Sequence, residues 1–130
     1  MGRLATTSLD PELAAYAERC RDLLGLAEWD ISLSEDDAPG GERGTVGHTI
    51  LDTRYIRATV TLLRDRTPEQ KRRTIRHEFL HIALAWVDQA ARHIIMKLPE
   101  DDRAWAWSLY GEAEDGTIER LVRALDAEYT

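Results

Sequence analysis

The stretch TPEQKRRTIRHEFLHIALAWVD, residues 67–88, decides the fold because it contains the most clearly marked helix of the chain. Thr67 is a good N-cap residue, Pro68 suits the first helical position, and Gln70 completes a capping box with Thr67. Four apolar side chains then follow along the predicted helix: Ile75, Phe79, Ile82 and Leu84. A helix with one side in a core is therefore predicted over about 68–88.

Three segments before this helix are predicted to be strands, two from alternating apolar and polar residues and the middle one from its content of Thr, Val and Ile. They are residues 29–34, 45–51 and 56–63, with a loop over 35–44 and a turn over 52–54. An amphipathic helix precedes them, with Asp10 as its N-cap, and ends near Gly25.

The last third of the chain has helical patterns only. A short helix is predicted over 90–96 and another over 104–110, and a C-terminal amphipathic helix is defined by Ile118, Leu121, Val122 and Leu125. The order of these elements predicts an α+β fold with a small mixed sheet packed on the long helix. At 130 residues, we expect a single domain over 1–130.

Composition excludes several classes of protein. The formal net charge is −7, and the only compact group of cations is Lys71, Arg72, Arg73 and Arg76, so nucleic acid is not an expected partner. No apolar run is long enough to span a bilayer, and the N-terminus lacks the apolar core of a secretory signal. Cys20 is the only cysteine, which excludes an internal disulfide and favours a cytoplasmic location.

The predicted long helix carries His77, Glu78 and His81 in the pattern H-E-x-x-H. Two histidines four residues apart share one helix face, so their imidazoles can converge on one Zn²⁺. Glu78 is rotated about 100° from His77, which frees its carboxylate to take a proton from water at the metal. The motif therefore predicts a zinc site in which Glu78 is a general base.

This motif helix, preceded by the strand-like residues 58–63, resembles the zincin metallopeptidases. By size and order, the chain is most similar to the small glutamate-zincins of bacterial and prophage genomes. The resemblance covers residues 29–88 well and the C-terminal third loosely. It implies a zincin-like fold, one bound Zn²⁺ and hydrolysis of a peptide or protein substrate, with the substrate left open.

The resemblance also implies a third metal ligand supplied by a later helix. Glu114 is the first candidate because it is spaced by four, seven and eleven residues from Ile118, Leu121 and Leu125. Glu119 is the second candidate, and His93 is an alternative found in DNA-linked zincins. Gly116 weakens the case for Glu114 if the C-terminal helix begins after it.

Two further roles are expected. Tyr110 is a candidate oxyanion donor, although packing with Trp105 and Trp107 is an alternative use of its ring. The run 56–63 is expected to be an edge strand that binds a peptide by strand addition. The leading hypothesis is a cytoplasmic zinc peptidase; the alternatives are a non-catalytic zincin-like binding or regulatory domain and a DNA-associated metalloprotease-like protein.

Overall fold

The computed structural model describes residues 2–129, and the chain divides into two compact units between Ala83 and Leu84. The first unit contains all strands of the described chain, and the second is helical. The single domain expected over 1–130 stays a prediction.

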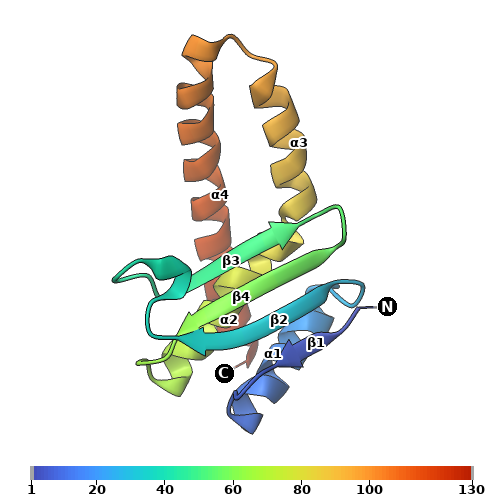
Figure 1. Ribbon diagram of the computed structural model, residues 1–130, viewed down its shortest axis with the longest axis vertical. Helices are drawn as coiled ribbons and strands as arrows, with labels where there is room; N and C mark the ends of the chain where they lie inside the picture. Colours follow the sequence, from blue (N-terminus) through green and yellow to red (C-terminus); the bar gives the residue numbers. More distant parts are fainter. Residues whose placement is uncertain (1, 130) are drawn as a thin grey trace. The chain divides into compact units, whose positions relative to one another are not determined.

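The first unit is a four-stranded mixed sheet with two helices on one face (Figure 1). Its elements are β1 (Leu4–Thr6), α1 (Pro11–Leu23), β2 (Asp30–Asp36), the short 3-10 helix η1 (Pro39–Gly41), β3 (Gly47–Asp52), β4 (Arg57–Leu63) and α2 (Pro68–Ala83). The strand order is β1-β2-β4-β3, with β1, β2 and β4 parallel and β3 antiparallel to β4. The α+β class and the small mixed sheet are confirmed.

The core of this unit lies between the sheet and the two helices. Alternate residues of β2 and β4 are buried, and α2 contributes Ile75 and Phe79, both completely buried. The period of two in the strands and the helical period in α2 therefore place apolar side chains on facing surfaces. The buried strand residues are Ile31, Leu33, Ala58, Val60 and Leu62.

Both helix starts predicted from the sequence are confirmed. The Asp10 carboxylate accepts hydrogen bonds from the backbone N–H groups of Glu12 and Leu13. At α2, the Gln70 N–H donates to Thr67 Oγ1 at 3.1 Å, and the Thr67 N–H donates to Gln70 Oε1 at 3.0 Å. This reciprocal pair is the capping box that the sequence predicted.

The position of residues 56–63 in the sheet was predicted wrongly. β4 is a central strand, paired along its length with β2 on one side and with β3 on the other. β3 is the edge strand beside it. One covered sheet face gives the same alternation in central and edge strands, so the pattern could not distinguish them. The three-residue strand β1 was not predicted, because Leu4–Thr6 is too short for a clear period.

The predicted continuous helix over 68–88 is also wrong. α2 ends at Ala83, Leu84 interrupts it, and α3 (Ala85–Met96) begins the second unit. Apolar residues continue through this point, so the sequence carries no Gly or Pro signal for the break.

The second unit is a hairpin of α3 and α4 (Glu100–Tyr129), which lie side by side in Figure 1. The Arg103 guanidinium donates hydrogen bonds to the carbonyls of Leu98 and Met96. These bonds link the first turn of α4 to the end of α3. The separate helices expected over 104–110 and near Ile118 form one helix that passes through Gly111 and Gly116. A helical glycine costs only about 1 kcal/mol relative to alanine, which a 30-residue helix can absorb.

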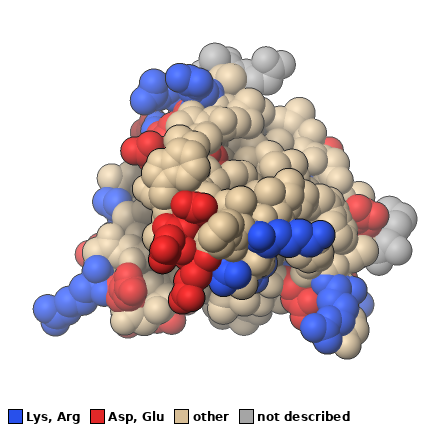
Figure 2. Space-filling model, turned by 90° about the horizontal axis from the view of Figure 1, so that it is seen from above, with Lys and Arg blue, Asp and Glu red and all other residues tan. Residues whose placement is uncertain are grey.

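Charge is dispersed on the face of the molecule shown in Figure 2. Lys and Arg groups there are scattered among Asp and Glu groups and do not form one continuous basic area. None of the described helices is both long enough and apolar enough to cross a membrane.

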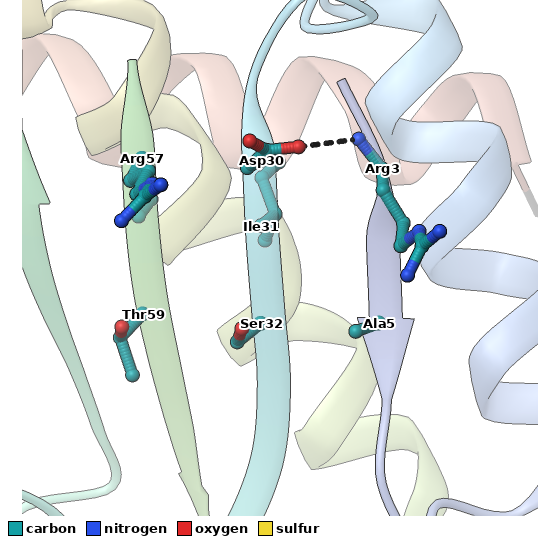
Figure 3. Close-up of a pocket in the computed structure, with 8 residues that line it drawn as sticks. Arg3, Ala5, Asp30, Ile31, Ser32, Arg57 and Thr59 are labelled. Carbon is teal, nitrogen blue, oxygen red and sulfur yellow. Dashed lines mark hydrogen bonds between the residues drawn. The ribbon is translucent and has the colours of Figure 1, made fainter. Parts of the chain in front are cut away.

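The sheet face that α1 and α2 do not cover carries polar residues and a shallow hollow of about 570 Å³ (Figure 3). Ser32 and Thr59 form part of its floor, and Arg3 and Arg57 stand at its sides. Asp30 Oδ1 accepts a hydrogen bond from the Arg3 N–H at 2.9 Å and so ties β1 to β2.

Candidate metal centre

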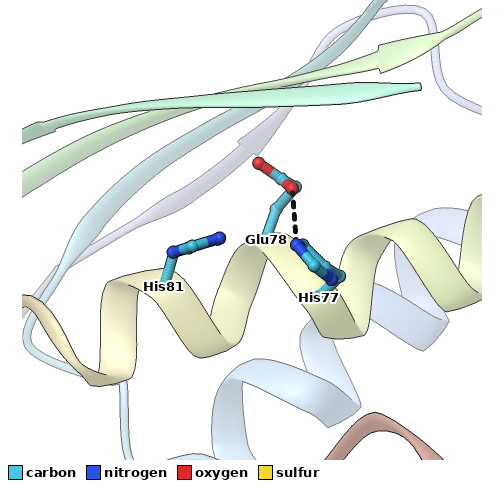
Figure 4. A group of neighbouring side chains, drawn as sticks. All are labelled: His77, Glu78 and His81. Carbon is cyan, nitrogen blue, oxygen red and sulfur yellow. Dashed lines mark ion pairs between the residues drawn. The ribbon is translucent and has the colours of Figure 1, made fainter. Parts of the chain in front are cut away.

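The three motif residues come together on one side of α2 (Figure 4). The potential ligand atoms of His77, Glu78 and His81 all lie within 4.8 Å of one another. The two imidazole rings are 5.1 Å apart between centroids and inclined at 63°. Glu78 Oε2 lies 3.9 Å from His77 Nε2. The expected convergence of these side chains on one point is therefore present.

The chemistry of this donor set fits zinc. Two Zn–N bonds of about 2.0–2.1 Å at a tetrahedral angle need nitrogens about 3.3 Å apart. Imidazoles whose nitrogens lie within 4.8 Å reach that separation by small side-chain rotations. Both histidines are partly exposed, so an ion and a water molecule can reach them from solvent.

Glu78 is more buried than the two histidines, and a hydrogen bond from the sheet holds its carboxylate. Its side chain is 9% exposed, against 31% for His77. The Thr49 hydroxyl of β3 donates a hydrogen bond of 2.8 Å to Glu78 Oε1. One carboxylate oxygen therefore binds the sheet, and the other, Oε2, faces His77.

The edge strand β3 approaches α2 closely at Gly47. A Cβ at this position would lie 2.5 Å from Thr74 Cγ2, which is too short for a real contact, and 3.2 Å from Glu78 Cγ, which is a tight contact. The absence of a side chain at Gly47 leaves room for Thr74 and Glu78 beneath the strand that carries Thr49. The sequence analysis missed Gly47 and Thr49, although a glycine inside a predicted strand is a known sign of close backbone approach.

The same turn of α2 is fixed to α1 by a buried polar contact. Arg76 is 5% exposed; its guanidinium donates a hydrogen bond to the Tyr16 hydroxyl and also lies over the Tyr16 ring. Burial, which outweighs the hydrogen bond from Arg76, raises the pKa of Tyr16 to about 12. The motif histidines thus belong to a helix held on two sides, by α1 and by β3.

In the second unit, the predicted residues Tyr110 and Glu114 lie together. The Tyr110 hydroxyl is within hydrogen-bond distance of Asp88 Oδ1 and lies 3.2 Å from Glu114 Oε2. Burial, followed by the interaction with Asp88, raises the pKa of Glu114 to about 7. Burial and the neighbouring carboxyl groups also raise the pKa of Tyr110. Glu114 therefore keeps its proton at a pH where a free carboxyl would have lost it.

The ring of Tyr110 also makes the aromatic contact that the sequence offered as an alternative. It meets Trp107 edge-on, with centroids 6.4 Å apart. The oxyanion role of Tyr110 stays a prediction.

The three candidates for the third ligand all belong to the second unit. Glu114 lies on the same continuous helix as Ile118, which meets the condition set for it, and Gly116 does not start a new helix. Glu119 is half-buried on α4, and His93 is exposed on α3. The choice among Glu114, Glu119 and His93 stays a prediction.

Comparison of the chain with protein-family models, curated proteins and solved structures finds no match. The case for a function therefore rests on the geometry around His77, Glu78 and His81.

Proposed function

We propose that the chain is a zinc-dependent peptidase in which His77 and His81 bind the metal and Glu78 is the general base. The observation that carries the proposal is the convergence of both imidazoles and the Glu78 carboxylate within 4.8 Å, with one oxygen of that carboxylate held by Thr49. A pair of surface histidines beside a solvated glutamate would need neither the burial of Glu78 nor its contact with the sheet.

The bound metal, Glu78 and Thr49 have separate roles in the proposed reaction. Bound zinc supplies a Lewis acid that lowers the pKa of water to about 7. Glu78 Oε2 accepts a proton from the attacking water as the new C–O bond forms, and passes it to the leaving nitrogen as the C–N bond breaks. The Thr49 hydroxyl fixes Oε1, so the carboxylate keeps its other oxygen on the His77 side. A third ligand is still needed, and Glu114 is the first candidate for it.

Because β4 is a central strand, the strand proposed to bind the substrate is β3 and not β4. β4 is paired on both sides, so it cannot bind a peptide by strand addition. β3 is the edge strand, and it is also the strand that contacts Glu78. A peptide added along β3 would lie beside the general base, which supports a peptide or protein as the substrate.

Cleavage of a fluorogenic peptide library by the zinc-loaded chain tests the proposal. We expect cleavage that a chelator abolishes, that zinc restores, and that falls by at least about a hundredfold in Glu78→Gln. Glu78→Gln should still bind one zinc, which separates loss of the base from loss of the metal. Stoichiometric zinc binding with no cleavage of any library member would contradict the peptidase and favour a zincin-like binding domain.

A further inference from the structure

One face of the α3–α4 hairpin is apolar where the two helices meet. A groove of about 370 Å³ runs between them and is lined only by Ala, Ile, Leu, Trp and Tyr. Three of its large side chains are more than half exposed: Ile94 by 65%, Trp105 by 68% and Leu109 by 53%. Grouped exposure of this kind is typical of a surface that associates with another molecule.

Alanines let another helix approach this groove closely. Ala91 on α3 and Ala106 and Ala113 on α4 alternate with the large side chains along the lining. A surface with both large projections and small depressions can interdigitate with a second helical surface of the same kind. The groove is therefore shaped to pack against helices.

Two opposite charges continue the apolar stripes at the closed end of the hairpin. Lys97, the C-cap residue of α3, follows Ile94 by three residues, and Asp101 precedes Trp105 by four residues on α4. Each therefore lies on the same helix face as its apolar neighbour. Both are exposed, and they lie on either side of Pro99, close to the connection between α3 and α4. One stripe thus ends in a cation and the other in an anion.

We propose that this groove is occupied by a second copy of the chain, packed face to face about a two-fold axis parallel to the helices. Such an axis sets α3 of one copy against α4 of the other, so Lys97 of each copy meets Asp101 of the other. The exposed Trp105 of each copy enters the groove of its partner. The charges favour a second copy because the face is complementary to itself, and this inference does not depend on the proposed function.

Sedimentation of the full chain tests this directly. We expect a species of twice the 14.8 kDa chain mass that dissociates on dilution from about 100 µM. Ile94→Glu and Trp105→Glu should each give a monomer with unchanged helix content. The matched control is Ile50→Glu, which places the same charge on a similarly exposed isoleucine of β3 and should leave the pair intact.

A charge exchange tests the two-fold arrangement itself. Lys97→Glu and Asp101→Lys should each weaken association by about tenfold, because each places like charges opposite one another at two symmetric positions. The double variant should recover most of the loss. A monomer at every concentration, or a dimer that survives both Ile94→Glu and Trp105→Glu, would overturn the proposal. A monomer that instead binds phosphatidylcholine vesicles through this face would also overturn it.

Discussion

In the first unit the large apolar side chains on the inner face of β2, β4 and α2 are buried, whereas in the second unit Ile94, Trp105 and Leu109 are each more than half exposed. In the first unit, a hydrogen bond from Thr49 of the edge strand β3 holds the carboxylate of Glu78 in place. In the second unit, the exposed apolar side chains form a surface of the kind that associates with another molecule. The contrast places the proposed chemistry in the unit whose core is enclosed and the proposed association on the hairpin whose apolar side chains are exposed.

The largest expected effect comes from removing a buried ring of the first unit. Phe79→Ala should lower the free energy of unfolding by about 3–5 kcal/mol, because Phe79 is completely buried and the loss leaves a cavity. Leu109→Ala is the counterpart in the second unit and should change it by less than about 0.5 kcal/mol at concentrations where the chain is monomeric. Urea unfolding of both variants measures this, and equal losses would contradict the contrast between the units.

The close approach of β3 to α2 gives the next effect. Gly47→Ala should cost about 1–3 kcal/mol, because the new methyl group would overlap Thr74 and press on Glu78. It should also separate Thr49 from Glu78 and so lower any hydrolytic activity more than Thr49→Ser does. Stability within about 0.5 kcal/mol of the parent chain would show that the strand does not need this contact.

Replacing a glycine of the second unit should raise the stability of the chain, the opposite of the effect at Gly47. Nothing lies within 4 Å of a Cβ built on Gly116, which is helical and exposed. Gly116→Ala should therefore raise the free energy of unfolding by about 0.5–1 kcal/mol. Thermal unfolding followed by circular dichroism gives the shift, and a lower melting temperature would mean that the space beside Gly116 is filled.

The smallest expected effect is a dependence of stability on pH in the metal-free chain. The folded state raises the pKa of Glu114 from 4.5 to about 7, so between these values it binds more protons than the unfolded state. This contribution to stability is complete below pH 4.5 and is lost as pH rises through about 7. In Glu114→Gln, melting temperatures measured from pH 5 to pH 8 should lose this decline. An unchanged profile would remove Glu114 as its source.

The parts of the fold that depend on local chemistry could be predicted from the sequence. The capping box of Thr67 and Gln70 and the N-cap at Asp10 involve residues only a few positions apart, and both are present. The His77–Glu78–His81 convergence is local in the same sense, because one helix supplies all three side chains.

Features that depend on contacts between residues far apart in the sequence could not be predicted from local patterns. The central place of β4 is set by its pairing with β2, which the alternation within β4 does not encode. Thr49 reaches Glu78 across 29 residues of sequence, so no motif joins them. The break at Leu84 falls inside an unbroken apolar pattern with no local signal.

Zinc binding tests the central claim most directly. Titration of the metal-free chain, followed by calorimetry and by metal analysis after dialysis, should give one zinc per chain. Glu78→Gln should retain that zinc, whereas His77→Ala and His81→Ala should each lower the affinity by at least about a hundredfold. A chain that binds no zinc, or binds it equally well without His77 and His81, would contradict the account.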